Sequence, residues 1–86
     1  MKHAGPEALK HLAPLLKDIR SVPFLNERRP GVFYRKSVAF LHFHEDAEGP
    51  FADLRTSGKE FVRYRVKTAT EQKSLLKRIV AAGETP

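Results

Sequence analysis

The sequence contains no cysteine, no tryptophan and a single methionine among its 86 residues. The absence of cysteine excludes disulfides, thiolate zinc sites and a cysteine nucleophile. Long hydrophobic runs are lacking too. Prolines and charges interrupt the amino-terminal segment, which therefore lacks the apolar centre of a secretion signal, and no stretch approaches the roughly 20 apolar residues of a membrane span. We expect a cytoplasmic protein that does not associate with membranes.

What the sequence does contain is an ordinary globular balance, with 41% hydrophobic and 30% charged residues. Residues 1–86 fit a single domain, and we expect flexible ends at 1–6 and 84–86. A chain this short buries only about 60 to 65% of its unfolded surface, which argues against a large enclosed active site. The formal net charge of +6 favours anionic partners such as nucleic acid.

The amino-terminal part shows helical periodicity. Apolar residues recur at helical spacing at Leu9, Leu12, Leu16 and Ile19. Pro14 interrupts this pattern because it lacks a backbone donor and disfavours a helical residue before it. Two alternatives follow: a kinked helix, or a frayed leader with a helix only over 14–21. Prolines, asparagine and glycine in 21–31 predict a loop there.

The middle of the chain is typical of an antiparallel meander. Four segments rich in valine, phenylalanine and tyrosine, separated by short polar turns, cover 32–35, 38–44, 50–55 and 60–66. Thr68 and Glu71 then match a capping box at the start of a final helix, which Gly83 is suited to end. The predicted fold is α+β with two layers: an N-terminal helix, a four-stranded antiparallel β-meander and a C-terminal helix.

Turn lengths indicate a register for this meander. A two-residue turn at 36–37 places Phe33 opposite Phe40, and a three-residue turn at 57–59 places Asp53 opposite Arg63. We prefer a middle hairpin that sets His42 opposite Asp53, because one face then becomes almost wholly apolar. That predicted core face carries Val32, Tyr34, Ala39, Leu41, Phe43, Ala52, Leu54, Val62, Tyr64 and Val66.

The opposite face mixes aromatic, imidazole and charged side chains. It carries Phe33, Arg35, Phe40, His42, His44, Phe51, Asp53, Arg55, Phe61, Arg63 and Arg65. If both helices cover the core face, its phenylalanines form an exposed patch larger than monomers usually tolerate, which predicts a ligand, a partner or a second subunit. The alternative is one helix on each face. Candidate ligand-binding residues are Phe40, His42, His44, Phe51, Asp53, Arg55, Phe61, Arg63 and Arg65.

Two histidines within this face have the spacing of a metal site. His42 and His44 project from one side of a strand and could bind one divalent metal, with acidic residues of the following loop adding oxygen ligands. The same acidic residues also fit a solvated hairpin loop. Alternatively, Asp53 could orient His42 as a general base, or the pair could be part of a polar cross-strand ladder. No nucleophile-elbow motif or glycine-rich phosphate loop accompanies them.

These features favour a binding or interaction module, without a required cofactor and forming a homodimer. One alternative is a single-stranded nucleic-acid-binding protein, because phenylalanines beside arginines suit base stacking and phosphate neutralisation. The other is a small metal-dependent or acid–base enzyme that uses His42 and His44.

The runs "IRSVPFLNERRPGVFYRKSVAFLHFHEDAEGPFADLR" and "TATEQKSLLKRIVAAG" resemble a group of small conserved bacterial proteins without an assigned function. More distantly, the order of elements is similar to MmcQ/YjbR-like proteins: a short helix, a loop containing Val22-Pro23, a meander containing 36–40 and a carboxy-terminal helix. The resemblance covers roughly residues 15 to 82. It implies a small cytoplasmic α+β protein and carries over no catalytic residue.

Overall fold

The fold is known from a computed structural model that describes residues 2–55 and 60–83. Its elements in chain order are β1 (Lys2–His3), α1 (Pro6–His11), α2 (Ala13–Arg20), β2 (Leu25–Arg29), β3 (Val32–Arg35), β4 (Val38–Asp46), β5 (Gly49–Leu54), β6 (Val62–Arg65) and α3 (Ala69–Gly83). The predicted α+β class is confirmed. Among these residues, no helix is long and apolar enough to cross a membrane.

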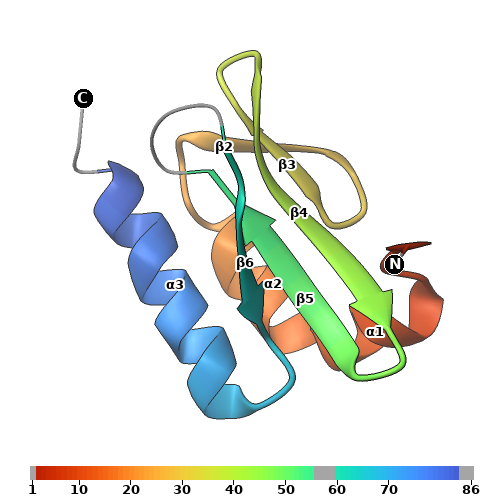
Figure 1. Ribbon diagram of the computed structural model, residues 1–86. Coiled ribbons are helices and arrows are strands. Elements are labelled where there is room, and N and C mark those ends of the chain that lie inside the picture. The colour runs from red at the N-terminus through yellow and green to blue at the C-terminus, as the bar shows by residue number, and fades with distance from the viewer. Residues whose placement is uncertain (1, 56–59, 84–86) are drawn as a thin grey trace.

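One antiparallel sheet holds all of the strands. Its order is β2-β3-β4-β5-β6, and β1 pairs with the part of β4 that extends past β3. Figure 1 shows α1 and α2 behind the sheet and α3 beside them. A single hydrophobic core lies between these helices and one face of the sheet. It contains Leu12, Leu15, Leu16, Ile19, Val22, Phe33, Phe40, Leu41, Phe43, Ala52, Leu54, Val66, Leu75, Ile79 and Ala82.

The amino-terminal helical segment is broken at Leu12, whose backbone (φ −88°, ψ 1°) separates α1 from α2. Pro14 lies in the first turn of α2, where backbone N–H groups have no intrahelical partner. Its missing N–H therefore costs the helix no hydrogen bond. Helix is therefore present on both sides of the break, as in the kinked-helix alternative. The predicted stripe is buried at Leu12, Leu16 and Ile19.

The sheet has five meander strands and not four, because the segment predicted as a loop contains β2. Pro23 and Pro30 flank this strand without interrupting it, and it pairs with β3 with a register shift between Glu27 and Arg29. Leu25 packs against the core, and Glu27 accepts two hydrogen bonds from the Arg20 guanidinium of α2, at 2.6 and 3.0 Å. Contacts to the helix layer thus hold a strand of mainly polar sequence at the sheet edge.

A β-bulge changes the predicted pairing of β3 with β4. Phe33 pairs with Leu41 and Tyr34 pairs with Ala39, which leaves Phe40 as the extra residue. The predicted pairing of Phe33 with Phe40 is therefore wrong. Both phenylalanines lie in the core, with exposed fractions of 1% and 3%.

The bulge also reverses the predicted face of β3. By alternation from Phe33, the side chains of Val32 and Tyr34 lie on the face turned away from the helices, not on the core face. Arg35 lies on the helix side, where its Nη1 donates a hydrogen bond to the Ala82 carbonyl of α3 at 3.0 Å.

The predicted register of the remaining strands is confirmed. His42 pairs with Asp53, and Asp53 pairs in turn with Arg63. The predicted turn at 57–59 lies outside the described residues. The capping box is also confirmed, because Thr68 Oγ1 accepts the Glu71 N–H at 3.1 Å while the Glu71 carboxylate accepts the Thr68 N–H at 3.0 Å.

Candidate functional site

The face of the sheet turned away from the helices, here called the remote face, carries all of the predicted ligand-binding candidates except Phe40. Strand alternation places on it His42, His44, Phe51, Asp53, Arg63 and Arg65, and ring contacts place Phe61 beside His42 and Arg55 over Phe61. Phe40 is in the core instead, because of the bulge. Cross-strand pairing therefore brings most of the predicted site together.

Three imidazoles form a cluster at one end of this face, here called the histidine cluster: His3, His42 and His44. The ring centroids of His3 and His44 lie 4.8 Å apart with the rings stacked, and His42 lies 5.9 Å from His44 and 6.3 Å from His3. The pairing of β1 with β4 sets His3 directly opposite His44. Sequence reasoning missed His3, because a two-residue strand has no periodicity to reveal it.

Asp53 links this cluster to β6. Its carboxylate accepts two hydrogen bonds from the Arg63 guanidinium, at 2.9 and 3.1 Å, and lies 3.3 Å from Nε2 of His44. The sequence left two alternatives for His42 and Asp53: Asp53 orients His42 as a general base, or the two belong to a polar cross-strand ladder. The register of that pair is correct, but the structure gives Asp53 its close imidazole contact with His44, the diagonal neighbour.

The environment of His42 disfavours its charged form. Partial burial lowers its pKa most, and the nearby His44 and His3 imidazoles lower it further, while the Asp53 carboxylate acts in the opposite direction. The surroundings of His42 therefore favour the neutral imidazole.

Arginine side chains cover the aromatic rings of the remote face. The Arg55 guanidinium carbon lies 4.7 Å from the centroid of the Phe61 ring, which also lies 4.8 Å from the His42 ring. Arg65 lies over Phe51 at 5.9 Å. Phe51 is only 9% exposed and Phe61 is half-buried.

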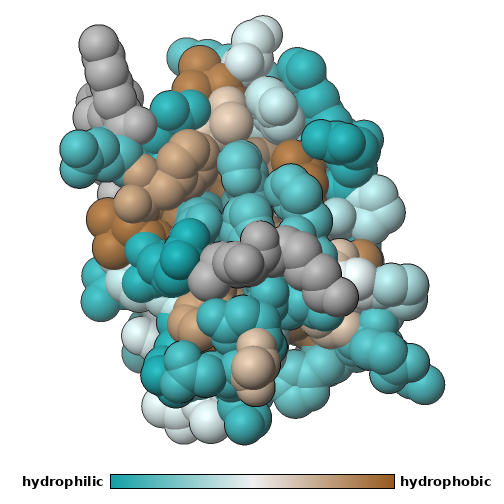
Figure 2. Space-filling view, turned by 45° about the vertical axis from the view of Figure 1, so that its right-hand side comes forward, coloured by the Kyte–Doolittle hydropathy of each residue, from teal (hydrophilic) through white to brown (hydrophobic). Residues whose placement is uncertain are grey.

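The expected patch of exposed phenylalanines is therefore absent from the described part of the chain. There, the large hydrophobic side chains that are exposed are Val38, Val62 and Val80. Figure 2 shows that hydrophilic side chains cover most of the visible surface, with smaller hydrophobic areas between them. The remote face is polar and aromatic, not an open apolar surface.

A third arginine–aromatic pair extends the face toward β2. The Arg28 guanidinium carbon lies 4.3 Å from the centroid of the Tyr34 ring. The sequence placed Tyr34 in the core, so this pair was missed. Its position depends on the bulge at Phe40, which the alternation of apolar residues did not reveal.

The predicted metal ligands His42 and His44 do lie side by side on the remote face. However, within residues 2–55 and 60–83, no group of three or more histidine, cysteine, aspartate or glutamate side chains is arranged to hold a metal ion. Two imidazoles alone leave most of a tetrahedral coordination sphere to other ligands. Metal binding by this pair stays a prediction.

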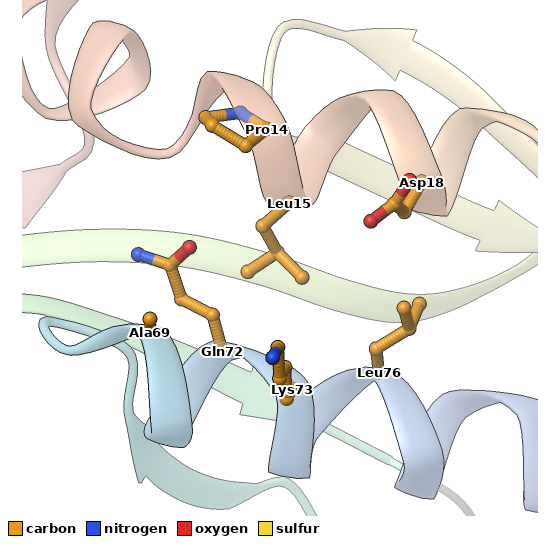
Figure 3. Close-up of a pocket in the computed structure, with 7 residues that line it drawn as sticks. All are labelled: Pro14, Leu15, Asp18, Ala69, Gln72, Lys73 and Leu76. Carbon is orange, nitrogen blue, oxygen red and sulfur yellow. The ribbon is translucent and has the colours of Figure 1, made fainter.

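A separate groove lies in the helix layer, between α2 and α3. Figure 3 shows Leu15 directed from α2 toward α3 and Leu76 directed from α3 toward α2, offset along the groove, with Lys73 between Gln72 and Leu76. This groove is mainly apolar and shares no residue with the remote face.

Comparison of the chain with protein-family models, curated proteins and solved structures finds no match. The resemblance to MmcQ/YjbR-like proteins accordingly stays a prediction.

Proposed function

We propose that the protein is a small binding module whose remote face binds single-stranded nucleic acid. The observation that carries this proposal is the set of three arginine–aromatic pairs on one side of the sheet: Arg28 with Tyr34, Arg55 with Phe61, and Arg65 with Phe51. Planar guanidinium groups and aromatic rings both stack on bases, and guanidinium also neutralises phosphate.

A single strand suits this surface better than a duplex. Bases of a single strand can turn outward and stack on protein rings, whereas duplex bases are already stacked on one another. Stacking is worth about 1 to 3 kcal/mol per base and tolerates any sequence, because every base has a planar face. We therefore expect little sequence preference and a strong dependence on salt.

The arginines that cover the aromatic rings also have polar partners, and Arg55 donates two hydrogen bonds to the Ala39 carbonyl. Arg65 lies 3.6 Å from the Glu48 carboxylate, but both side chains are more than half exposed, so this pair is screened by solvent. A phosphate group can replace such a carboxylate at little cost. Arg63, in contrast, is held by two hydrogen bonds to Asp53 and serves to fix the face.

The test is the fluorescence anisotropy of a labelled oligothymidylate at low salt, against a duplex of equal length. Wild-type protein should prefer the single strand. Phe61→Leu and Arg65→Gln should each weaken binding roughly 5- to 150-fold, the range that about 1 to 3 kcal/mol of stacking corresponds to.

Arg78→Gln is the matched control. Arg78 of α3 covers Tyr64 at 4.6 Å, so this substitution removes the same charge and the same kind of pair at a place away from the remote face. Absence of binding at low salt would end this proposal. Equal losses for Arg65→Gln and Arg78→Gln would also contradict it, because the attraction would then be a general effect of net charge.

Homodimerisation stays a prediction and does not enter this proposal, because the exposed phenylalanines that motivated it are covered. Sedimentation equilibrium tests it directly. A molecular mass near the 9.8 kDa of the chain would contradict it.

A further inference from the structure

The groove between α2 and α3 is an apolar feature of the helix layer to which the proposed function gives no role. Pro14 and Leu15 line it from α2, and Leu76 lines it from α3. Beyond Leu76, the apolar surface of α3 continues with Val80, a large hydrophobic side chain that is 47% exposed. Contiguous apolar surface with polar groups at its rim is typical of a contact between proteins.

Each helix contributes one charged side chain to the lining of this groove. Asp18 of α2 follows Pro14 by one helical turn, and Lys73 of α3 precedes Leu76 by about one turn. Both charged residues are exposed. Within residues 2–55 and 60–83, neither of them forms an ion pair. A partner that covers the groove can therefore offer an opposite charge to each.

The arrangement of these charges matches a second copy of the same chain. Figure 3 shows that α2, followed from Pro14 to Asp18, runs in the same direction as α3 along the groove. A half-turn about an axis perpendicular to the groove beside Leu15 therefore exchanges the two helices and reverses their direction. It carries Asp18, from the later part of α2, to the early part of α3, where Lys73 lies. Two copies related in this way form the same acid–base contact twice, as an isologous interface requires.

We propose that the α2–α3 groove is the interface of a homodimer, in which two copies pack through their helix layers about a twofold axis. Leu76 of each copy covers Pro14 and Leu15 of the other, and Asp18 of each copy pairs with Lys73 of the other. The interface thus lies on the helix layer and not on the sheet face that the sequence suggested. Both remote faces point outward in this dimer, so the proposal is independent of nucleic-acid binding.

The test is the dimer dissociation constant, measured by sedimentation equilibrium over a wide range of protein concentration. Wild-type protein should pass from 9.8 kDa at low concentration to twice that mass at high concentration. Asp18→Lys and Lys73→Asp should each raise the dissociation constant roughly tenfold, because an exposed ion pair contributes little but the twofold axis counts each substitution twice. Both positions are exposed, so both variants should fold, which circular dichroism checks.

An equimolar mixture of these two variants is the sharpest sample. In the heterodimer that they form, both contacts again join opposite charges, so the mixture should dimerise about as well as the wild type. The double variant Asp18→Lys/Lys73→Asp should recover for the same reason. Lys17→Asp is the matched control, because it makes the same change of charge as Lys73→Asp at an exposed residue of α2 outside the groove. It should change the dissociation constant by no more than about twofold.

Three results would overturn this interface. A mass of 9.8 kDa at every concentration would do so, and the groove would then be left to a partner of another sequence. A dimer that tolerates Asp18→Lys and Lys73→Asp, or whose loss is not restored in their mixture, has its interface elsewhere. An equal loss in Lys17→Asp would show a general effect of net charge.

Discussion

Replacement of Phe40 with alanine distinguishes between the bulged sheet of the structure and the regular sheet that simple alternation predicts. In the structure, the Phe40 side chain is 3% exposed and its ring meets the Phe24 ring edge-on, with centroids 5.9 Å apart. Without the bulge, Phe40 would lie on the same face as Phe61. Phe40→Ala and Phe61→Ala would then destabilise the protein by similar amounts.

The expected cost follows from burial and the cavity that remains. Truncation of a buried phenylalanine to alanine destabilises a protein by about 3 to 5 kcal/mol, because lost transfer energy and a residual cavity add. The half-buried Phe61 should cost only about 1 kcal/mol. A domain of this size has a total stability of roughly 4 to 13 kcal/mol, so Phe40→Ala removes a large fraction of it.

Urea unfolding followed by circular dichroism measures both variants, and Phe40→Leu provides a milder substitution if Phe40→Ala does not fold. A double-mutant cycle of Phe24→Leu with Phe40→Leu should give a coupling of about 0.5 to 1.5 kcal/mol for the edge-on ring pair. If Phe40→Ala costs no more than Phe61→Ala, the bulge and the core position of Phe40 are wrong.

Three further substitutions test other parts of the structure by the same unfolding assay. Thr68→Ala should lower the free energy of unfolding by about 1 kcal/mol, because it removes the N-cap of α3. Thr70→Ala, at an exposed position, should cost less than half of that. Equal losses for the two variants would contradict the capping box. The hydrogen bond from Arg20 lowers the pKa of Glu27, so this carboxylate stabilises the fold at neutral pH, and the contribution is lost as pH falls below the ordinary glutamate value of about 4.3. The deficit of Glu27→Gln relative to wild type should therefore be at most about 1 kcal/mol near pH 7 and vanish toward pH 3; a deficit independent of pH would refute the ion pair. Gly31→Ala should cost about 1 to 2 kcal/mol because φ is +77° there, and an unchanged stability would contradict that turn geometry.

Local patterns in the sequence were sufficient where neighbouring strands alternate without interruption. The pairing of His42 with Asp53 and of Asp53 with Arg63 followed from choosing the register that makes one face apolar, because a slip of one residue would expose the core. The capping box at Thr68 is equally local, since it depends only on residues three apart.

The missed features depend on contacts distant in sequence. β2 is polar and flanked by prolines, and its pairing with β3 and the ion pair to α2 hold it in the sheet. The bulge at Phe40 goes together with a core position of its ring beside Phe24, which alternation cannot show. His3 joins the site only because backbone bonds hold the amino-terminal segment against β4, among them Ala4 N–H to the Phe43 carbonyl at 3.1 Å. Most of the candidate site was thus predictable, but the residues at its two ends were not.

The most direct test of the remote face as a nucleic-acid surface is an NMR titration of the protein with oligothymidylate, observed at the arginine Nε–H resonances. The side chains of Arg55 and Arg65 should shift strongly with added single strand, while Arg78, which covers Tyr64 beside α3, should not. Shifts confined to Arg78 and to the amides of α2 and α3, or no shifts at low salt, would contradict the proposal.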